Sequence, residues 1–386
     1  MFAYVHIRLV LPFAVGRAVK IAVGAGLFLV SQVHLLNKIL VPGWPAPELP
    51  AWALMAEGGL FLGLVLLFFS LLARDLARLA RRFIGRSKLG REQAVSLSRR
   101  RFLVKGALGL PAAYGAKQAL AAGMILAPAA YGVSRGVAVP DIRSTRVALP
   151  SLPRSLDGLV IAQISDTHIS PLLRENWARE LVDKVNGCSP DIIVITGDLV
   201  DGLPDNRADA IAPFRKFQAR YGVFACPGNH EYYAGYAAWM DVFRNLGIRM
   251  LCNDHASLGI NGADLVIAGL TDSAAEQFSL PAPDLAAALR GSPENGTRIL
   301  LDHRPGNAAL NSLHGVALQL SGHTHGGHMI GMDGLVSLFN QGFVRGWYKA
   351  DTMPLYVNSG AGLWNGFPVR LGVPSEIARI TLHGVV

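Results

Sequence analysis

Long apolar stretches dominate the first third of the chain. They cover residues 21–40, 51–73 and 102–133. The second contains a single acid, Glu57, and is long enough to cross the hydrocarbon core of a bilayer, which is about 30 Å thick. Polar residues interrupt the first, so a buried core helix is an alternative there, and the third contains Lys105 and Lys117. This pattern predicts a transmembrane region with about three helices over residues 1–135.

Shorter apolar runs alternate with helical spacing in the rest of the chain. Residues 136–157 are mixed and contain three prolines, which predicts a linker before a globular domain over residues 158–386. Apolar runs typical of buried strands occupy residues 159–165, 191–196, 223–226, 298–301, 316–320 and 355–358. Helices are predicted over 177–185, 208–220 and 236–246, and Asn261-Gly262 predicts a hairpin. The order indicates an α/β fold (α+β layered), with one mixed sheet or two packed sheets flanked by helices.

Charge is unevenly distributed along the chain. Residues 1–140 carry 17 Lys or Arg against 4 Asp or Glu, whereas residues 141–386 carry 19 against 23. The net charge of +9 therefore belongs to the apolar third, and the mildly acidic globular part argues against nucleic-acid binding. Nine Arg and one Lys lie between residues 74 and 101, with only two acids among them. By the positive-inside rule this loop is cytoplasmic, so the following domain is expected on the periplasmic or extracytoplasmic side of a bacterial inner membrane.

The basic loop ends in Ser98-Arg99-Arg100-Arg101-Phe102-Leu103, directly before the third apolar stretch. This hexapeptide resembles the twin-arginine export motif. Arginines beside an apolar segment also occur simply as topological charge. Both interpretations place the globular domain outside the cytoplasm.

Candidate metal ligands follow five of the predicted strands. In chain order they are Asp166 and His168, Asp198, Asn229 and His230, His303, and finally His323 and His325. Side chains at the carboxyl ends of neighbouring strands converge on one edge, where α/β sheets place their sites. Neutral imidazole is the commonest protein ligand for transition metals, and five of the eleven histidines fall in these turns. The sequence therefore predicts a metal site at this edge.

The motifs D-x-H, G-D, G-N-H-E, a lone histidine and G-H-x-H, in this order, resemble the calcineurin-like metallophosphoesterase superfamily over about residues 158–386. Residues 322–327 and 358–362 are most similar to its membrane-linked bacterial branch, which includes the YkuE- and YaeI-type phosphoesterases. The resemblance implies two packed mixed sheets flanked by helices, with a dinuclear metal site.

The resemblance also implies a role for each matching residue. Asp166, His168 and His325 would hold one metal ion, and Asn229, His303 and His323 would hold the second. Asp198 would bridge the two ions, and His230 would face the phosphate and stabilise or protonate the leaving oxygen. This mixed nitrogen and oxygen set fits two divalent metal ions, Mn, Fe, Zn or Co, without choosing among them. The cysteines, Cys188, Cys226 and Cys252, lie outside the motifs and are expected as buried thiols without disulfides.

Several residues near the motifs have open roles. Glu231 or Asp302 could orient a ligating imidazole, or could be ordinary cap or surface carboxylates. Arg304 could contact a substrate phosphate, and His328 could line the pocket, lie behind the ligands or remain at the surface. Three aromatic residues could shape the pocket rim, cover an acyl chain or pack in the core: Trp347, Tyr348 and Trp364.

The expected protein is a membrane-anchored metal-dependent phosphoric ester hydrolase that cleaves a phosphodiester or pyrophosphate with metal-activated water. Its expected partners are the membrane lipid bilayer and a phosphate-ester substrate, and tethering favours a lipid-linked substrate. The sequence predicts no oligomeric state. One alternative is a catalytically silent metal-binding or sensory module tethered to the membrane. Another is a small transporter or channel with an extracytoplasmic domain, which the poorly defined first apolar stretch disfavours.

Overall fold

The computed structural model describes residues 1–386 except 13–14, 41–46, 87–109 and 385–386. These residues form two compact units. The first comprises residues 1–36 and 56–131, and the second comprises residues 37–55 and 132–386.

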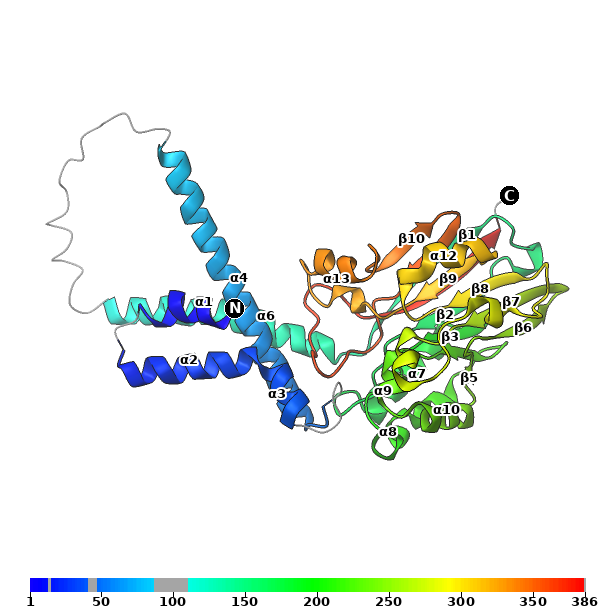
Figure 1. Ribbon diagram of the computed structural model, residues 1–386, viewed down its shortest axis with the longest axis horizontal. Helices are drawn as coiled ribbons and strands as arrows, with labels where there is room; N and C mark the ends of the chain where they lie inside the picture. The colour runs from blue at the N-terminus through cyan, green and yellow to red at the C-terminus, as the bar shows by residue number, and fades with distance from the viewer. Residues whose placement is uncertain (13–14, 41–46, 87–109, 385–386) are drawn as a thin grey trace. The chain divides into compact units, whose positions relative to one another are not determined.

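The first unit is built from helices (Figure 1). They begin with α1 (Phe2–Val5) and a π-helical turn (His6–Val10), followed by α2 (Arg17–Ser31), α3 (Val33–Leu40), α4 (Ala51–Arg86) and α6 (Leu110–Gly136), with the ends of α3, α4 and α6 shared with the second unit. Among the described helices, the segment Ala51–Arg81 of α4 is the one long and apolar enough to cross a membrane. The first predicted span is two helices, α2 and α3, because Gln32 between them leaves helical geometry.

The second unit contains a six-stranded sheet in the order β1-β12-β2-β3-β4-β5. Four parallel strands, β2 (Val160–Ile164), β3 (Ile192–Thr196), β4 (Val223–Cys226) and β5 (Arg249–Met250), adjoin β12 (Glu376–Gly384) and β1 (Asp141–Leu149). One face is covered by α7 (Glu175–Gly187), α8 (Pro204–Ile211) and α10 (Tyr236–Asn245). Trp239 and Phe243 of α10 are fully buried in this layer.

The second sheet has the order β10-β11-β9-β8-β7-β6. Its strands are β6 (Asp254–Ile260), β7 (Ala263–Gly269), β8 (Thr297–Leu301), β9 (Leu318–Ser321), β10 (Gly346–Ala350) and β11 (Met353–Val357), of which β7, β8, β9 and β11 are parallel. The predicted turn at Asn261-Gly262 joins β6 and β7, and both residues have the positive φ that this hairpin requires. Short helices α9 (Asn229–Tyr233), α11 (Leu285–Leu289), α12 (Ala308–Asn311) and α13 (Asp333–Phe339) complete the unit.

The two sheets pack face to face. Val194 of the first sheet and Leu320 of the second belong to one fully buried cluster between them. Their neighbours Ile193 and Ile195 point the other way, toward the helices, because successive side chains of a strand alternate between faces. The predicted α/β architecture of two packed mixed sheets with flanking helices is therefore confirmed.

Two local predictions differ from the structure. The predicted linker contains β1, an edge strand with only its last residues buried, so its sequence lacks the apolar run expected of a central strand. The predicted helix over 208–220 is instead α8 followed by a 3-10 segment (Ala212–Lys216). Pro213 ends the α-helix there because it offers no N–H and its ring crowds the preceding turn.

Candidate metal centre

The predicted ligands lie at the carboxyl ends of strands from both sheets. Asp166 and His168 follow β2, Asp198 follows β3, Asn229 and His230 begin α9 after β4, His303 follows β8, and His323 and His325 follow β9. Short backbone hydrogen bonds hold these loops together, including Asp166 N–H to Gly197 O at 3.0 Å and Gly322 N–H to His303 O at 2.9 Å. The seam between the two sheets thus brings all eight residues to one place.

One group of three ligand atoms comes from Asp166, His168 and His325. His168 Nε2 lies 3.2 Å from His325 Nε2, and Asp166 Oδ1 lies 3.6 Å from His325 Nε2 and 4.0 Å from His168 Nε2. Burial and the neighbouring His328 hold the pKa of His325 well below its usual range, so its imidazole is neutral. A cation between these atoms would relieve the repulsion between their inward-facing lone pairs, so the group fits a metal ion.

A second group comes from Asp198, His303 and His323. His303 Nε2 lies 3.1 Å from Asp198 Oδ2 and 3.2 Å from His323 Nδ1. Burial opposes a charge on His303, yet Asp198 raises its pKa to about 10. The Asp198 carboxylate therefore stabilises a positive charge at this point, and either a proton or a metal ion can supply that charge.

Two further observations connect these groups. Asp198 Oδ2 also lies 3.7 Å from His168 Nε2, so this carboxylate faces ligands of both groups. Asn229 is buried, and its Oδ1 has no hydrogen-bond partner among the described residues. A buried carbonyl oxygen without a partner is costly unless it serves as a ligand. These residues fit a metal-binding site in which Asp198 faces both groups.

Hydrogen bonds behind the ligands fix which ring nitrogen faces inward. His303 Nδ1 donates to Thr196 O at 2.7 Å, and His168 Nδ1 donates to Asp201 Oδ1 at 3.0 Å. Each Nε2 is thereby left with its lone pair directed at the site, the usual arrangement of metal-binding histidines. Asp201 was missed by the sequence analysis, although it lies only three residues after Asp198 in Gly197-Asp198-Leu199-Val200-Asp201.

His230 is placed differently from the ligands. Its Nδ1 donates to Asp201 Oδ1 at 2.6 Å, and its backbone N–H donates to Asp198 Oδ1 at 2.8 Å. Although burial disfavours its charged form, Asp198 and Asp201 raise the pKa of His230 to about 9. The ring lies near His168 and Asp198 and completes a third group of close ligand atoms with them. With Nδ1 bound to Asp201, only Nε2 of His230 remains to act on a substrate.

The backbone of the ligand loops is strained and closely packed. Asp166, His168, Asp198, His323 and His325 all have positive φ, between 41° and 69°, which non-glycine residues adopt only when their surroundings compensate. A Cβ at Gly322 would overlap Ser165 and Asp166, and a Cβ at Gly228 would overlap Asp198. These glycines let the ligand loops approach one another.

The residues with open roles take structural positions. Glu231 is buried and accepts backbone N–H groups of Gly228, Leu199 and Asp198 at 2.7–3.0 Å, so it pins two ligand loops instead of orienting an imidazole. Asp302 accepts from Asn311 Nδ2 at 3.0 Å, so its described hydrogen bond is to an amide and not to an imidazole.

Arg304 and His328 both contact a predicted ligand. Arg304 pairs with Asp272 at 2.7 Å, and its Nη1 lies 2.9 Å from His323 Nε2. The ring of His328 packs behind His325, with centroids 4.8 Å apart.

The three aromatic residues with open roles divide between core and site. Trp347 and Tyr348 pack into the domain, with Trp347 donating to Thr145 and Tyr348 accepting from Val344 N–H. Trp364 lies edge-on to His230, with ring centroids 6.4 Å apart. All three cysteines are free thiols. Cys188 and Cys226 are buried, as expected, whereas Cys252 is only partly buried.

The segment before α4 also contacts the site. Glu48 pairs with Arg207, whose Nε donates to the Asp201 carbonyl at 3.0 Å. Asn365 Nδ2 donates to Pro47 O at 3.2 Å, and its N–H points at Asp201 Oδ2 at 3.4 Å. We name Pro47 and Glu48 the strap. The strap and the Asp201 loop are thus joined by four hydrogen-bonded or ion-paired contacts within the second unit.

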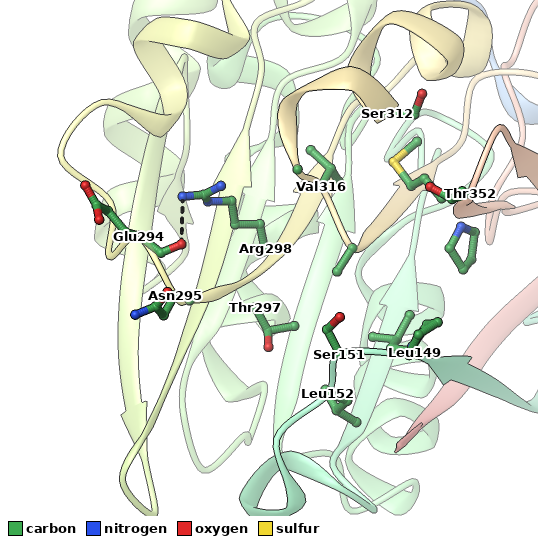
Figure 2. Close-up of a pocket in the computed structure, with 16 residues that line it drawn as sticks. Leu149, Ser151, Leu152, Glu294, Asn295, Thr297, Arg298, Ser312, Val316 and Thr352 are labelled. Atoms are coloured by element: carbon green, nitrogen blue, oxygen red, sulfur yellow. Dashed lines mark hydrogen bonds between the residues drawn. The ribbon is translucent and has the colours of Figure 1, made fainter. Parts of the chain in front are cut away.

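A separate cavity of about 530 Å³ lies at the other edge of the second sheet, by the amino ends of β8, β9 and β11 (Figure 2). It is lined by residues such as Ser151, Arg298, Ser312 and Thr352, and Arg298 Nη2 donates to the Glu294 carbonyl at 3.4 Å. None of the predicted ligands lines this cavity.

Comparison with known proteins agrees with this geometry. Residues 159–327 match the family model described as calcineurin-like phosphoesterase. The chain is 40% identical over 247 residues to the uncharacterized metallophosphoesterase Cj0846 of Campylobacter jejuni, which covers 64% of each chain. It is 32% identical over 251 residues to a transmembrane protein with metallophosphoesterase domain of Danio rerio, covering 63% of this chain and 57% of that protein.

A third relative is matched over nearly its whole length. It is the uncharacterized metallophosphoesterase YkuE of Bacillus subtilis, 32% identical over 297 residues, which cover 74% of this chain and 98% of YkuE. The chain spans less than two thirds of the length of the Campylobacter and Danio relatives. A buried cluster of Asp, Asn and His lies at the ends of β2, β3, β4, β8 and β9. Together with these matches, it shows that the chain belongs to the calcineurin-like metallophosphoesterase family.

Proposed function

We propose that this chain is a membrane-anchored phosphoesterase that uses two divalent cations to hydrolyse a phosphodiester or pyrophosphate. The main support for this proposal is the position of Asp198, whose Oδ2 lies 3.1 Å from His303 Nε2 and 3.7 Å from His168 Nε2. A carboxylate that faces two imidazole groups at once is the bridge that a two-cation site requires. The cations are Mn, Fe, Zn or Co, because the donor set suits each of them.

In this proposal, Asp166, His168 and His325 would hold one cation, and Asn229, His303 and His323 would hold the other. When bound there, the cations would supply Lewis acidity toward the phosphoryl oxygens and toward the attacking water. Asn229 contributes a neutral oxygen, which limits the negative charge that opposes an anionic substrate.

His230 protonates the leaving oxygen. Its Nδ1–H is held by Asp201 at 2.6 Å, so the proton that it donates is the one on Nε2. With its pKa raised to about 9 by Asp198 and Asp201 against the effect of burial, the imidazole carries that proton at neutral pH. Asp201 keeps the ring oriented during the transfer.

The membrane part of the proposal rests on α4 and on the division of the chain into units. Residues 37–55, before the apolar body of α4, belong to the same compact unit as residues 132–386, which include the end of α6. If α4 crosses a membrane, α6 must therefore return through it. With 27 residues, α6 is about 40 Å long, so its length suits that return even though its composition alone does not identify it as a span. The charge of residues 74–101 then supports an inner-membrane protein with its domain on the periplasmic side.

Purified full-length protein tests the chemistry. We expect hydrolysis of the chromogenic diester bis-p-nitrophenyl phosphate with Mn²⁺ and two metal ions per chain after dialysis. Asp198→Asn should abolish turnover and lower the metal content, whereas Asp205→Asn, an exposed carboxylate on α8, should change neither. Metal binding without turnover on any diester or pyrophosphate would instead support the catalytically silent module.

Reporter fusion tests the orientation. An alkaline phosphatase reporter joined after Val386 should be active, and a green fluorescent reporter at the same point should be dark. The reverse result would place the domain in the cytoplasm and overturn the periplasmic assignment.

A further inference from the structure

An unusual apolar surface lies on α13 and just before it. Ile330, Leu335, Leu338 and Phe339 are 73%, 49%, 78% and 80% exposed. Leu335, Leu338 and Phe339 have the spacing i, i+3, i+4, so they share one face of the helix. Soluble proteins seldom gather so many large apolar side chains on one exposed element unless that element contacts a partner or a membrane. We name these four residues the apolar face.

The apolar face is attached directly to a metal-ligand loop. Asp333 at the start of α13 pairs with Arg345, whose Nη2 lies 2.9 Å from Asp333 Oδ2. Arg345 Nη1 also donates to Gly326 O at 2.6 Å, one residue after the predicted ligand His325. Helix α13 is therefore held in position beside the site by a side chain that contacts both.

The apolar face is also close to the point where the chain enters the domain from α6. Ile330 N–H donates to Leu371 O at 3.0 Å, and the adjacent Arg370 N–H donates to Gly132 O at 2.9 Å. Gly132 lies in the last turns of α6, within the second unit. Consecutive residues of one segment thus hold both the apolar face and the end of a helix that we propose to emerge from the membrane.

We propose that the apolar face is a membrane-contact surface, which inserts into the interfacial layer of the bilayer that α4 enters. This inference rests on the proposed membrane anchoring and deepens it. Short helices with one apolar face bind in the plane of the interface between headgroups and acyl chains. The link to Gly132 favours a lipid surface over a protein partner. Gly132 lies in the helix that we propose to emerge from the membrane, and two backbone hydrogen bonds, through Leu371 and Arg370, connect Ile330 to it. The metal centre would then act on phosphates in the headgroup layer.

An environment-sensitive fluorophore tests the contact in the full-length protein reconstituted in nanodiscs. The label is placed at Phe339→Cys in a Cys252→Ser background, since Cys188 and Cys226 are buried. Leu313→Cys is the matched control because Leu313 is 74% exposed and lies just before β9, at the edge away from the ligands. We expect brominated lipids to quench the label at 339 by at least two-fold and to leave the label at 313 unchanged. No quenching at 339, or equal quenching at both sites, overturns the proposal.

Activity separates this inference from the proposed function. Replacing both Leu338 and Phe339 with Ser should leave hydrolysis of a soluble chromogenic diester in detergent unchanged, because these side chains are exposed and contact no predicted ligand. The same variant should hydrolyse a phosphodiester lipid in nanodiscs several-fold more slowly. Equal activity on the lipid would refute the membrane contact, while turnover of the soluble diester would show that the phosphoesterase chemistry stands.

Discussion

Replacing Asp201 with asparagine removes a negative charge from the centre of the site at almost constant side-chain volume. Asp201 Oδ1 lies 2.6 Å from His230 Nδ1 and 3.0 Å from His168 Nδ1. The substitution therefore acts on the proposed proton donor and on a proposed ligand together. Asparagine can still accept one ring N–H, but it offers no charge to an imidazolium.

The expected effect on His230 follows from its electrostatic surroundings. Burial lowers its pKa, and Asp198 and Asp201 raise it to about 9. One carboxylate at hydrogen-bond distance shifts a buried pKa by about 1–3 units. Because Asp198 remains, Asp201→Asn should lower the pKa of His230 by about 1–3 units. The acting form is protonated, so activity falls as pH rises through this pKa, and the alkaline limb of the pH profile should move to lower pH by the same amount.

The effect on His168 is on metal binding. Its Nδ1–H loses a charged acceptor, and changes of this kind behind a ligand cost about 10–100-fold in metal affinity. The two effects are separated by measuring kcat between pH 5 and 10 at saturating Mn²⁺, and then the Mn²⁺ concentration for half-maximal activity at fixed pH. Asp205→Asn, four residues further along and exposed, is the matched control. An unshifted alkaline limb would falsify the role of Asp201 in holding the proton on His230.

Three further substitutions test other parts of the site. Asn229→Ala removes a buried oxygen without a partner among the described residues, so elemental analysis should find metal content falling toward one ion per chain; unchanged content would exclude Asn229 as a ligand. Gly322→Ala should destabilise the protein by about 1–3 kcal/mol and reduce metal content, because the added methyl group overlaps the loop after β2. In the control Gly259→Ala, the methyl group meets nothing within 4 Å, so the melting temperature should stay nearly unchanged. Glu48→Gln breaks an ion pair whose side chains are 28% and 11% exposed, so thermal unfolding should report a loss of about 1–3 kcal/mol, against about 0–1 kcal/mol for the exposed pair of Glu175, and equal losses would contradict a structural role of the strap.

The sequence could predict which residues the structure brings together because each motif is local. Asp166 and His168 directly follow an apolar run, as do His323 and His325, and parallel strands bring their carboxyl ends to one edge. The order of strands in each sheet, however, depends on long-range pairing. The sequence therefore indicated two sheets or one without deciding between them, and the structure places β2, β3 and β4 in one sheet and β8 and β9 in the other.

Residues that act through three-dimensional neighbours were not predictable. Asp201 lies further along the loop after β3 than Asp198, so its contact with His168 and His230 depends on how three loops fold together. Glu231 was weighed as an orienting carboxylate, but its partners are backbone N–H groups, which carry no sequence signal. Strand β1 lacks an apolar run because most of it is exposed at the sheet edge.

The strap and Arg370 together connect the site to both ends of the helical region. Glu48 of the strap lies three residues before α4 begins, and it reaches the Asp201 loop by pairing with Arg207. Arg370 N–H is bonded to Gly132 in α6, and its guanidinium donates to His325 O at 3.3 Å and to Ser359 O at 2.7 Å. The Asp201 loop and the loop that contains His325 are thus each held by a segment that continues into a helix of the proposed membrane region. The two segments that flank the helical region therefore support the metal centre, since a domain cut at residue 132 would keep the Arg370 contact and lose the strap.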